Sequence, residues 1–512
     1  MRFSTEGFTS KVVAAILAFS RLVSAQPIIF DKRDVGSSAD KWKDQSIYQI
    51  VTDRFARSDG STTADCLVSD RKYCGGSYKG IIDKLDYIQG MGFTAIWISP
   101  VVEQIPDNTA YGYAYHGYWM KNIDELNTNF GTADELKQLA SELHSRSMLL
   151  MVDVVYNHYA WNGDGSSVDY SSFTPFNQQS YFHDYCLITN YNDQTNVEDC
   201  WEGDTEVSLP DLSTEDNEVI GVFQTWVSDF VQNYSIDGLR IDSAKHVDTA
   251  SLTKFEDASG VYNLGEVYQG DPTYTCPYQN YMKGVTNYPL YYPVYRFFSD
   301  TSATSSELTS MISTLQSSCS DVSLLGNFIE NHDQVRFPSV TSDTSLIKNA
   351  MAFIILGDGI PIIYYGQEQG LNGGSDPANR EALWLSGYNT DSEYYELISK
   401  LNQIRNQAIK KDSAYSTYKS SVVSSSDHYI ATRKGSDANQ LISIFNNLGS
   451  NGSQDITVSN TGYSSGDKVI DIISCNSVSA GDFGSLSVSI SGGMPQVYAP
   501  SSVLSGSGIC NQ

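Results

Sequence analysis

Three acidic residues end short apolar runs of the chain, where side chains with functional groups follow a hydrophobic segment. Asp242 ends the run 236–242, Glu266 ends 261–266 and Asp333 ends 324–333. Cleavage of a glycosidic bond needs one carboxylic acid to protonate the leaving oxygen and a carboxylate to attack or to activate water. A single acid at such a position more often caps a helix or pairs with an arginine. Three of them at strand ends indicate a shared catalytic pocket.

The neighbours of these acids indicate how their roles would differ. Arg240 precedes Asp242 by two residues, so both side chains point to the same side of a strand. A fixed cation favours the anionic form of Asp242, which a nucleophile requires. Glu266, among other acids, is expected to stay protonated. The pattern therefore predicts a nucleophile and an acid with different pKa values.

The elements that must position these acids alternate between apolar strands and helices. Helix-like stretches at 132–145, 217–233 and 344–356 lie between apolar runs, and Thr132 with Glu135 resembles a capping box. Alternation of this kind predicts an α/β fold, a (β/α)8 TIM barrel whose strand ends converge on one rim. The predicted strands are 47–55, 93–100, 148–158, 236–242, 261–266, 324–333 and 359–367.

Two segments interrupt the alternation. Residues 159–212 lack helical periodicity and are rich in Asn, Asp, Ser, Gly and Tyr, which predicts an irregular inserted domain after strand 3. After residue 412 the chain is rich in Ser and Gly with short alternating runs such as 440–445 and 486–490, which predicts a C-terminal antiparallel β-sandwich domain. The predicted division is barrel at 34–158 and 213–412, insertion at 159–212 and β domain at 413–512.

The start of the chain predicts secretion. Basic residues precede an apolar run and small residues follow it, so 1–25 is predicted to be a signal peptide, and Lys32-Arg33 predicts a pro-peptide at 26–33. Eight cysteines follow, and an even number in a secreted chain suggests disulfides. Asn233 and Asn451 begin glycan acceptor sequences. Pairing neighbouring cysteines gives Cys66–Cys74, Cys186–Cys200, Cys276–Cys319 and Cys475–Cys510.

Charge and composition exclude several classes of protein. The formal net charge of −28 comes from 32 basic and 60 acidic residues, which argues against nucleic acid and anionic membrane partners. No later segment is apolar for long enough to span a membrane. HExxH and Walker patterns do not occur. With only 18% charged residues, the surface suits neutral, hydroxyl-rich partners.

Five segments of the chain carry a resemblance to a known family. They are DVVYNH at 153–158, SLPDL at 208–212, GLRIDSAKH at 238–246, GEV at 265–267 and FIENHD at 328–333. These segments resemble the signature regions of the α-amylase family, glycoside hydrolase family thirteen. The likeness to its secreted fungal and yeast members extends over almost the whole chain after the leader. Gln334-Val335, Tyr268-Gln269 and Glu202 depart from the fungal pattern, which bears on product lengths and not on the reaction.

The resemblance implies a role for each matching residue. Asp242 matches the nucleophile, Glu266 the general acid/base and Asp333 the transition-state stabiliser, while Arg240 matches the arginine that supports the nucleophile. The implied sugar-binding residues are His158 and His332 at the cleaved glucose, Lys245 and His246 on the reducing-end side, Tyr118 and Trp119 after His116 on the other side, and the pair Asp376 and Arg380.

The resemblance also implies a calcium ion. Asn157, Glu198 and Asp211 match its ligands at the junction of barrel and insertion, with the carbonyl oxygen of His246 as a further ligand. On the sequence alone, Glu198 and Asp211 would be ordinary loop acids. Calcium takes six to eight oxygen ligands and would stabilise this junction by binding only the folded form.

The function implied is extracellular endo-hydrolysis of α-1,4-glucosidic bonds in starch, glycogen and malto-oligosaccharides, with retention of configuration. An α-glucosidase or a transglycosylase on the same scaffold remains an alternative, because water and a sugar hydroxyl compete for one intermediate. A noncatalytic starch-binding protein is disfavoured because all three acids are intact. We expect a monomer by default.

Overall fold

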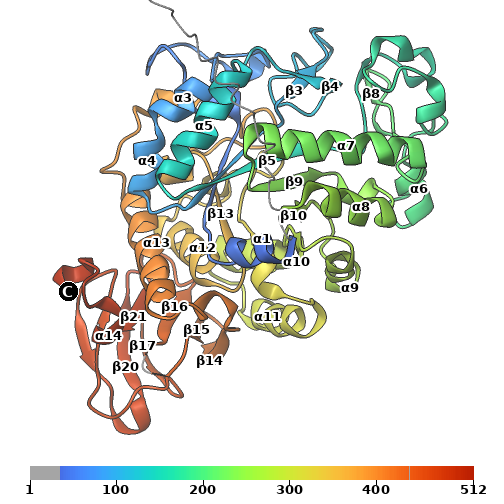
Figure 1. Ribbon diagram of the computed structural model, residues 1–512. Helices are drawn as coiled ribbons and strands as arrows, with labels where there is room; N and C mark the ends of the chain where they lie inside the picture. The colour runs from blue at the N-terminus through green and yellow to red at the C-terminus, as the bar shows by residue number, and fades with distance from the viewer. Residues whose placement is uncertain (1–34, 438) are drawn as a thin grey trace, which may run out of the picture.

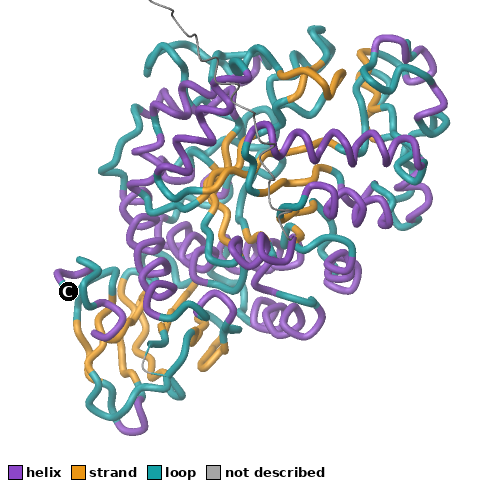
Figure 2. The backbone as a smooth tube through the Cα atoms, in the orientation of Figure 1, coloured by secondary structure: helices purple, strands orange, loops and turns teal. Residues whose placement is uncertain are grey.

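A parallel barrel forms the centre of the computed structural model, which describes residues 35–437 and 439–512 (Figures 1 and 2). Its eight strands are ordered β11-β10-β9-β5-β2-β1-β13-β12, and a parallel bridge between Thr286 and Gly326 joins the two ends. The predicted barrel is confirmed. Its strands are β1 (Ile47–Ile50), β2 (Ala95–Ile98), β5 (Leu149–Val155), β9 (Gly238–Asp242), β10 (Tyr262–Gly265), β11 (Gly284–Val285), β12 (Gly326–Asn327) and β13 (Ile360–Tyr364).

Helices surround this barrel (Figure 2). The three predicted helices are present with nearly the predicted limits, and Thr132 and Glu135 form the expected capping box at the start of α5. The helices are α1 (Val35–Trp42), α2 (Thr52–Phe55), α3 (Tyr78–Asp83), α4 (Leu85–Gly90), α5 (Ala133–Ser145), α7 (Asn217–Tyr234), α8 (Thr249–Ser259), α9 (Pro272–Thr275), α10 (Tyr288–Ser299), α11 (Ser306–Ser318), α12 (Thr344–Leu356) and α13 (Glu393–Lys411).

Three barrel strands differ from the sequence prediction. Of the predicted run 47–55, only Ile47–Ile50 is a strand, and Thr52–Phe55 forms the helix α2. The predicted strand 324–333 contributes only β12 to the sheet, and residues 328–333 continue as a loop. β11 is not among the predicted runs, because two residues are too few to show a hydrophobic pattern. Because β12 is short, Asp333 lies in the loop that follows it.

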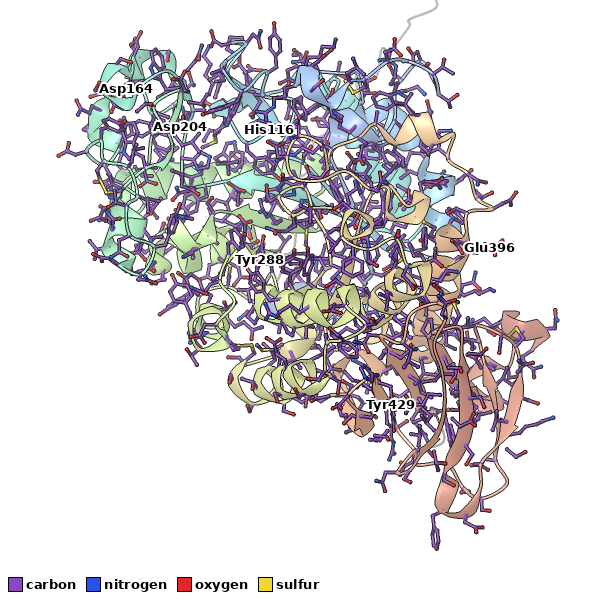
Figure 3. The ribbon with its side chains drawn as sticks, turned by 180° about the vertical axis from the view of Figure 1, so that it is seen from behind. His116, Asp164, Asp204, Tyr288, Glu396 and Tyr429 are labelled. Atoms are coloured by element: carbon purple, nitrogen blue, oxygen red, sulfur yellow. A yellow bond between two sulfur atoms is a disulfide. The ribbon has the colours of Figure 1, made fainter. Side chains whose placement is uncertain are left out.

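The segment 159–212 leaves the barrel after β5 and carries little regular structure (Figure 1). Cys186 and Cys200 form a disulfide across it. Figure 3 shows Asp164 and Asp204 of this segment at the opposite end of the view from Tyr429. The elements here are β6 (Trp161–Asn162), α6 (Gln194–Asp199), β7 (Glu202–Gly203) and β8 (Val207–Leu209), and the hairpin β3 (Val102–Gln104) and β4 (Met120–Leu126) lies before them in the chain.

The C-terminal part of the chain forms two antiparallel sheets, ordered β14-β15-β16-β21-β18-β19 and β17-β20. Ile442 and Ile444 of one sheet share a buried cluster with Ile456 and Val488 of the other, as the predicted C-terminal β domain requires. The strands are β14 (Ser421–Ser426), β15 (Tyr429–Lys434), β16 (Leu441–Asn446), β17 (Ser453–Val458), β18 (Lys468–Asp471), β19 (Ser477–Ser479), β20 (Leu486–Ser491) and β21 (Gln496–Pro500), followed by α14 (Ser501–Leu504).

All four predicted disulfides are present, and none of the described cysteines is free. Asn233 and Asn451 are exposed. Within residues 35–437 and 439–512, the helices are too short or too polar to cross a membrane. The predicted signal peptide (1–25) and pro-peptide (26–33) lie outside the described residues. The division of the chain at residues 158, 212 and 412 stays a prediction.

Candidate active site

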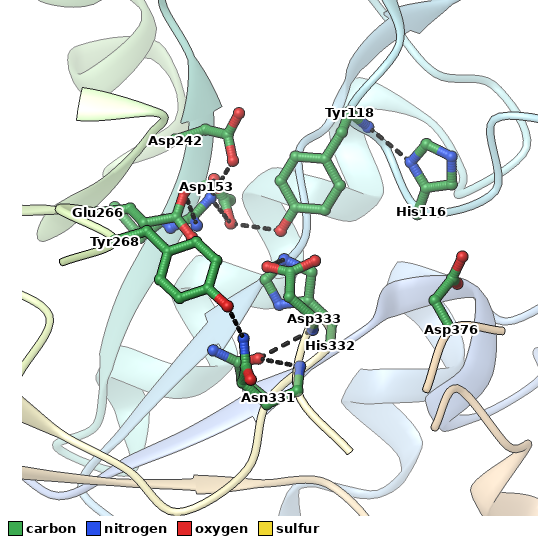
Figure 4. Close-up of polar contacts among 12 residues, drawn as sticks. His116, Tyr118, Asp153, Asp242, Glu266, Tyr268, Asn331, His332, Asp333 and Asp376 are labelled. Carbon is green, nitrogen blue, oxygen red and sulfur yellow. Dashed lines mark hydrogen bonds and ion pairs between the residues drawn. The ribbon is translucent and has the colours of Figure 1, made fainter. Parts of the chain in front are cut away.

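The carboxyl ends of the barrel strands β9, β10 and β12 bring the three predicted acids together (Figure 4). Asp242 is the last residue of β9 and Glu266 directly follows β10, which pairs with β9 in parallel. Asp333 lies in the loop after β12. Segments far apart in the sequence thus contribute to one rim, as the barrel prediction requires.

Arg240 connects the acids of this rim. Its Nη1 donates to Asp242 Oδ1 at 2.6 Å and to Asp153 Oδ1 at 3.0 Å, and its Nη2 lies 2.9 Å from Glu266 Oε2. β5 and β9 place Asp153 directly beside Arg240 in the register of the sheet. One buried guanidinium therefore fixes two of the predicted catalytic carboxylates relative to each other.

The environment of Glu266 favours its protonated form. Burial raises the pKa of Glu266 to about 8, and Asp242 and Asp333 add to this while Arg240 opposes it. Ser243 N donates to Glu266 Oε2 at 3.1 Å, which, like Arg240, lowers the pKa without offsetting burial. A carboxyl group in this state carries its proton at neutral pH and can donate it to a leaving oxygen.

Asp242 differs from the sequence prediction in the sign of its net pKa shift. Burial raises the pKa of Asp242 from 3.8, and this effect outweighs the lowering by Arg240 that the sequence indicates. The cation still opposes burial through the 2.6 Å contact. Burial raises the pKa of Asp333 as well, with Arg380 opposing it.

Twelve of the residues predicted for catalysis and substrate binding line a cleft of about 350 Å³. Arg240 is not among the lining residues but contacts the acids of the cleft. Glu202, Leu209, Ser243 and Tyr268 complete the lining. The predicted residues that line it are His116, Tyr118, Trp119, His158, Asp242, Lys245, His246, Glu266, His332, Asp333, Asp376 and Arg380.

Tyr118 is held in place by contacts on two sides. Its ring stacks on His332 at 4.9 Å between centroids and 5° between planes, and its hydroxyl donates to Asp153 Oδ2 at 2.8 Å. Trp119 packs edge-on against His116 at 4.6 Å. Both Tyr118 and Trp119 stay partly exposed to the cleft. A fixed ring of this kind can stack on the apolar face of a sugar.

Arg380 contacts both Asp376, its partner in the remaining predicted sugar-binding pair, and Asp333, the third acid. Its Nη1 lies 2.9 Å from Asp376 Oδ1, and its Nη2 lies 3.5 Å from Asp333 Oδ1. His332 Nε2 lies 3.2 Å from Asp333 Oδ2. Burial, together with Arg240 and Arg380, holds the pKa of His332 well below its usual value, so this imidazole is neutral.

Glu202 is a fifth carboxylate in the cleft, beside Asp242, Glu266, Asp333 and Asp376. Its Oε2 lies 3.5 Å from His158 Nδ1 and its Oε1 lies 3.5 Å from His246 Nε2. These two histidines follow different barrel strands, β5 and β9. Glu202 therefore ties the inserted segment to two cleft histidines.

Sequence reasoning assigned no role to three buried residues beneath the cleft. Asp153 binds Arg240 and Tyr118, Trp97 Nε1 donates to Asp153 Oδ2 at 3.0 Å, and Gln49 Nε2 lies 2.9 Å from His332 Nδ1. Asp153 begins the segment 153–158, and its acidic side chain inside a buried strand is the signal that identifies it. Nothing comparable marks Gln49 or Trp97.

The candidate calcium ligands fit a cation in part. Asn157 and Asp211 are buried together, with Asn157 Nδ2 donating to Asp211 Oδ1 at 2.7 Å. Asn157 Oδ1 has no hydrogen-bond partner within the described residues, and burial raises the pKa of Asp211 to about 7. A buried oxygen and a buried carboxylate are donors that calcium prefers.

The other two candidate ligands are less closely joined to this pair. Glu198 Oε1 accepts from Gln194 Nε2 at 2.7 Å, and α6 lies against residues 244–246. Asp211 Oδ2 lies 2.7 Å from His183 Nδ1, a residue that the sequence does not single out. No group of three or more His, Cys, Asp or Glu side chains poised for a metal occurs among the described residues. A cation here would use carbonyl and amide oxygens together with the carboxylates of Asp211 and Glu198.

Comparisons with known proteins identify the family. The model described as "Alpha amylase, catalytic domain" matches residues 49–435, and "Alpha-amylase, domain C" matches residues 422–512. The chain belongs to the alpha-amylase family. It is an enzyme of the starch-hydrolysing type that this family contains.

Individual alpha-amylases match nearly all or all of the chain. The chain is 99% identical over 512 residues to "Alpha-amylase 1" of Schwanniomyces occidentalis, covering all of both chains. It is 65% identical to "Alpha-amylase" of Saccharomycopsis fibuligera, over 95% of this chain and 97% of that one. The solved alpha-amylase of Malbranchea cinnamomea has a TM-score of 0.90 at 51% identity, covering 92% of this chain and 100% of its own.

Proposed function

We propose that this alpha-amylase cleaves internal α-1,4-glucosidic bonds of starch, glycogen and malto-oligosaccharides with retention of anomeric configuration. The observation that carries the proposal is the sharing of one guanidinium by two carboxylates, with Arg240 at 2.6 Å from Asp242 and at 2.9 Å from Glu266. Retaining enzymes keep their two carboxyl groups about 5–5.5 Å apart. A common arginine partner supports this short separation.

In the proposed first step, Glu266 gives its proton to the glycosidic oxygen while a carboxylate oxygen of Asp242 attacks the anomeric carbon. The glycosidic bond breaks, the leaving sugar departs with the proton, and a glycosyl ester forms on Asp242. The pKa of Glu266 at about 8 supports its role as the proton donor.

In the proposed second step, Glu266 is a carboxylate and takes a proton from water, whose oxygen attacks the same anomeric carbon. The ester bond breaks and Asp242 returns to its anionic form. Asp333, held by His332 and Arg380, is proposed to stabilise the positive charge that develops on the sugar in both steps.

The remaining cleft residues are proposed to bind the sugar chain. His158 and His332 would contact hydroxyls at the cleaved glucose, with Lys245 and His246 on the reducing-end side. His116, Tyr118 and Trp119, and the pair Asp376 and Arg380, would hold sugars on the other side. Their common position around the cleft supports these assignments.

Calcium is proposed as a stabilising ion held by Asn157, Glu198, Asp211 and the His246 carbonyl oxygen. When bound, it would supply positive charge between the barrel and the inserted segment and take no part in bond cleavage. The unsatisfied Asn157 Oδ1 and the buried Asp211 support this position. We also propose that the enzyme is secreted and acts as a monomer.

The test of endo-cleavage is the size of the first products from soluble starch. An endo-acting enzyme should release a mixture of short oligosaccharides and lower the viscosity early. Glucose as the sole early product would indicate an α-glucosidase, and lengthened chains would indicate a transglycosylase. Either result would overturn the proposal.

A further inference from the structure

A second hollow of about 680 Å³ follows helix α7 and shares no lining residue with the catalytic cleft. It lies between α7 and the end of β4, with residues from Asn217 to Tyr234 along its length. At 1.5 Å per residue, the helix supplies a groove of about 25 Å. We call this hollow the α7 groove.

Aromatic rings form part of the wall of the α7 groove. Trp226 stacks on Phe230 with 4.7 Å between ring centroids and 12° between planes. Trp226 Nε1 also donates to the carbonyl oxygen of Ile123 in β4 at 2.7 Å. The indole is therefore fixed, and it stays partly exposed. Such a ring suits the C–H face of a sugar.

The charged residues that line the α7 groove restrict the class of ligand that it can bind. Asp124, Glu125, Glu218 and Asp229 line it and are exposed, while no lysine or arginine is among its lining residues. Anionic ligands are disfavoured by this field. Exposed carboxylates instead accept hydrogen bonds from hydroxyl and amide groups. A neutral carbohydrate fits both the ring and the acids.

A carbohydrate attachment sequence lies at one end of the α7 groove. Asn233 lines the groove, is exposed, and makes no hydrogen bond to the described residues through its side chain. Ser235, the third residue of Asn233-Tyr234-Ser235, caps α7 with a φ of 53°. Asn233 follows Trp226 by seven residues, two helical turns on the same face, or about 10 Å. A disaccharide spans a similar length.

We propose that the α7 groove holds the first two N-acetylglucosamine units of a glycan attached to Asn233. The link forms when Asn233 Nδ2 attacks the anomeric carbon of a lipid-diphosphate-linked oligosaccharide, which releases the lipid diphosphate and a proton. The attached sugars then stack on Trp226 and donate hydrogen bonds from hydroxyl and amide groups to the Asp229 carboxylate. Their role is to cover the apolar wall between α7 and β4.

The test uses the intact enzyme secreted from a yeast host and an endoglycosidase that cuts between the first two N-acetylglucosamine units. Asn451, in a turn of the C-terminal domain, begins the second acceptor sequence and is the internal control. Glycopeptide mass spectrometry should show cleavage at Asn233 about tenfold slower than at Asn451 in the native enzyme. This ratio corresponds to about 1.4 kcal/mol of packing free energy. After denaturation the two rates should be equal.

Two variants test whether contacts in the α7 groove cause the protection of the Asn233 glycan. Trp226→Ala should make the native cleavage rates at Asn233 and Asn451 equal. Asp229→Ala, at an exposed position that leaves the core intact, should also reduce the protection of Asn233. Equal rates at Asn233 and Asn451 in the native wild-type enzyme would mean that the groove holds another occupant, and the inference would be wrong. Protection that persists in both variants would overturn it too.

The inference rests on the secretion included in the proposed function, but the two fail differently. Modification of Asn451 without modification of Asn233 would sink the inference and leave secretion intact. No glycan at either position would overturn the inference, whereas failure of the enzyme to reach the culture medium would contradict secretion.

Discussion

The catalytic cleft and the α7 groove are both hollows lined by aromatic rings and carboxylates, yet their acids have opposite surroundings. In the cleft, Asp242, Glu266 and Asp333 contact arginine or histidine side chains. In the groove, all four acids are exposed and no arginine or lysine lines the wall with them.

This difference separates binding from bond cleavage. Burial with a fixed cation gives two carboxyl groups different proton affinities and a fixed geometry, which acid and nucleophile catalysis requires. Exposed acids without a cation keep their hydration and can only accept hydrogen bonds. Changes in the cleft should therefore alter rates, and changes in the groove should not.

The largest effect is expected for Asp242→Asn. The amide cannot form the glycosyl ester, so kcat should fall by about 10⁴-fold or more, in the range of losses seen when an enzyme loses its nucleophile. Binding of maltoheptaose, measured by calorimetry, should persist. The matched variant Asp229→Asn in the groove should keep the full rate. A near-normal kcat for Asp242→Asn would refute the assignment.

Glu266→Gln should lower kcat by about 10²–10⁴-fold, because general acid catalysis is lost. The same residue sets an expected pH limit in the unmodified enzyme. Its carboxyl is protonated below its pKa of about 8, so the rate should decline as pH rises through about 8. The pH–rate profile of kcat/KM measures this. A profile that stays flat beyond pH 9 would exclude Glu266 as the acid.

Chelation should lower stability before it affects chemistry. An ion present at about 100 times its Kd stabilises the folded enzyme by about 2.7 kcal/mol, so a chelator should lower the Tm of a chain of this length by about 3 °C. Differential scanning calorimetry measures this without substrate. Asp211→Asn should abolish the response and the exposed Asp184→Asn should keep it. An unchanged Tm would contradict the calcium proposal.

A smaller effect is expected for Glu202→Gln. Its carboxylate lies 3.5 Å from both His158 and His246, so a neutral amide should hold these imidazoles less firmly. We expect KM to rise about tenfold with a smaller change in kcat, as for a loss of substrate positioning. The exposed Glu206→Gln, in the same segment, is the control. A fall in kcat at constant KM would assign Glu202 to the chemistry instead.

The parts of the fold that the sequence predicts are those with a long hydrophobic period. α7 fills enough turns to show one buried face, and α12 is apolar on nearly every side. β5 and β9 are mainly apolar, interrupted by Asp153 in β5 and by Arg240 and Asp242 in β9. β11 has two residues and leaves no such pattern, since its place is set by its neighbour β10.

The candidate site follows the same rule. Asp242 and Glu266 end recognisable strands, so their convergence follows from the barrel alone. The contact of Glu202 with His158 and His246 depends on the path of an irregular segment, which no period encodes. The net rise in the pKa of Asp242 depends on burial, which a sequence position does not give.

The most direct test of the central claim, attack by Asp242 with Glu266 as the acid, is the anomer of the first product. Proton NMR of maltoheptaose hydrolysis, recorded before mutarotation, should show the new reducing end as the α anomer, because two displacements restore the original configuration. A β anomer as the first product would mean a single displacement by water and would contradict the account.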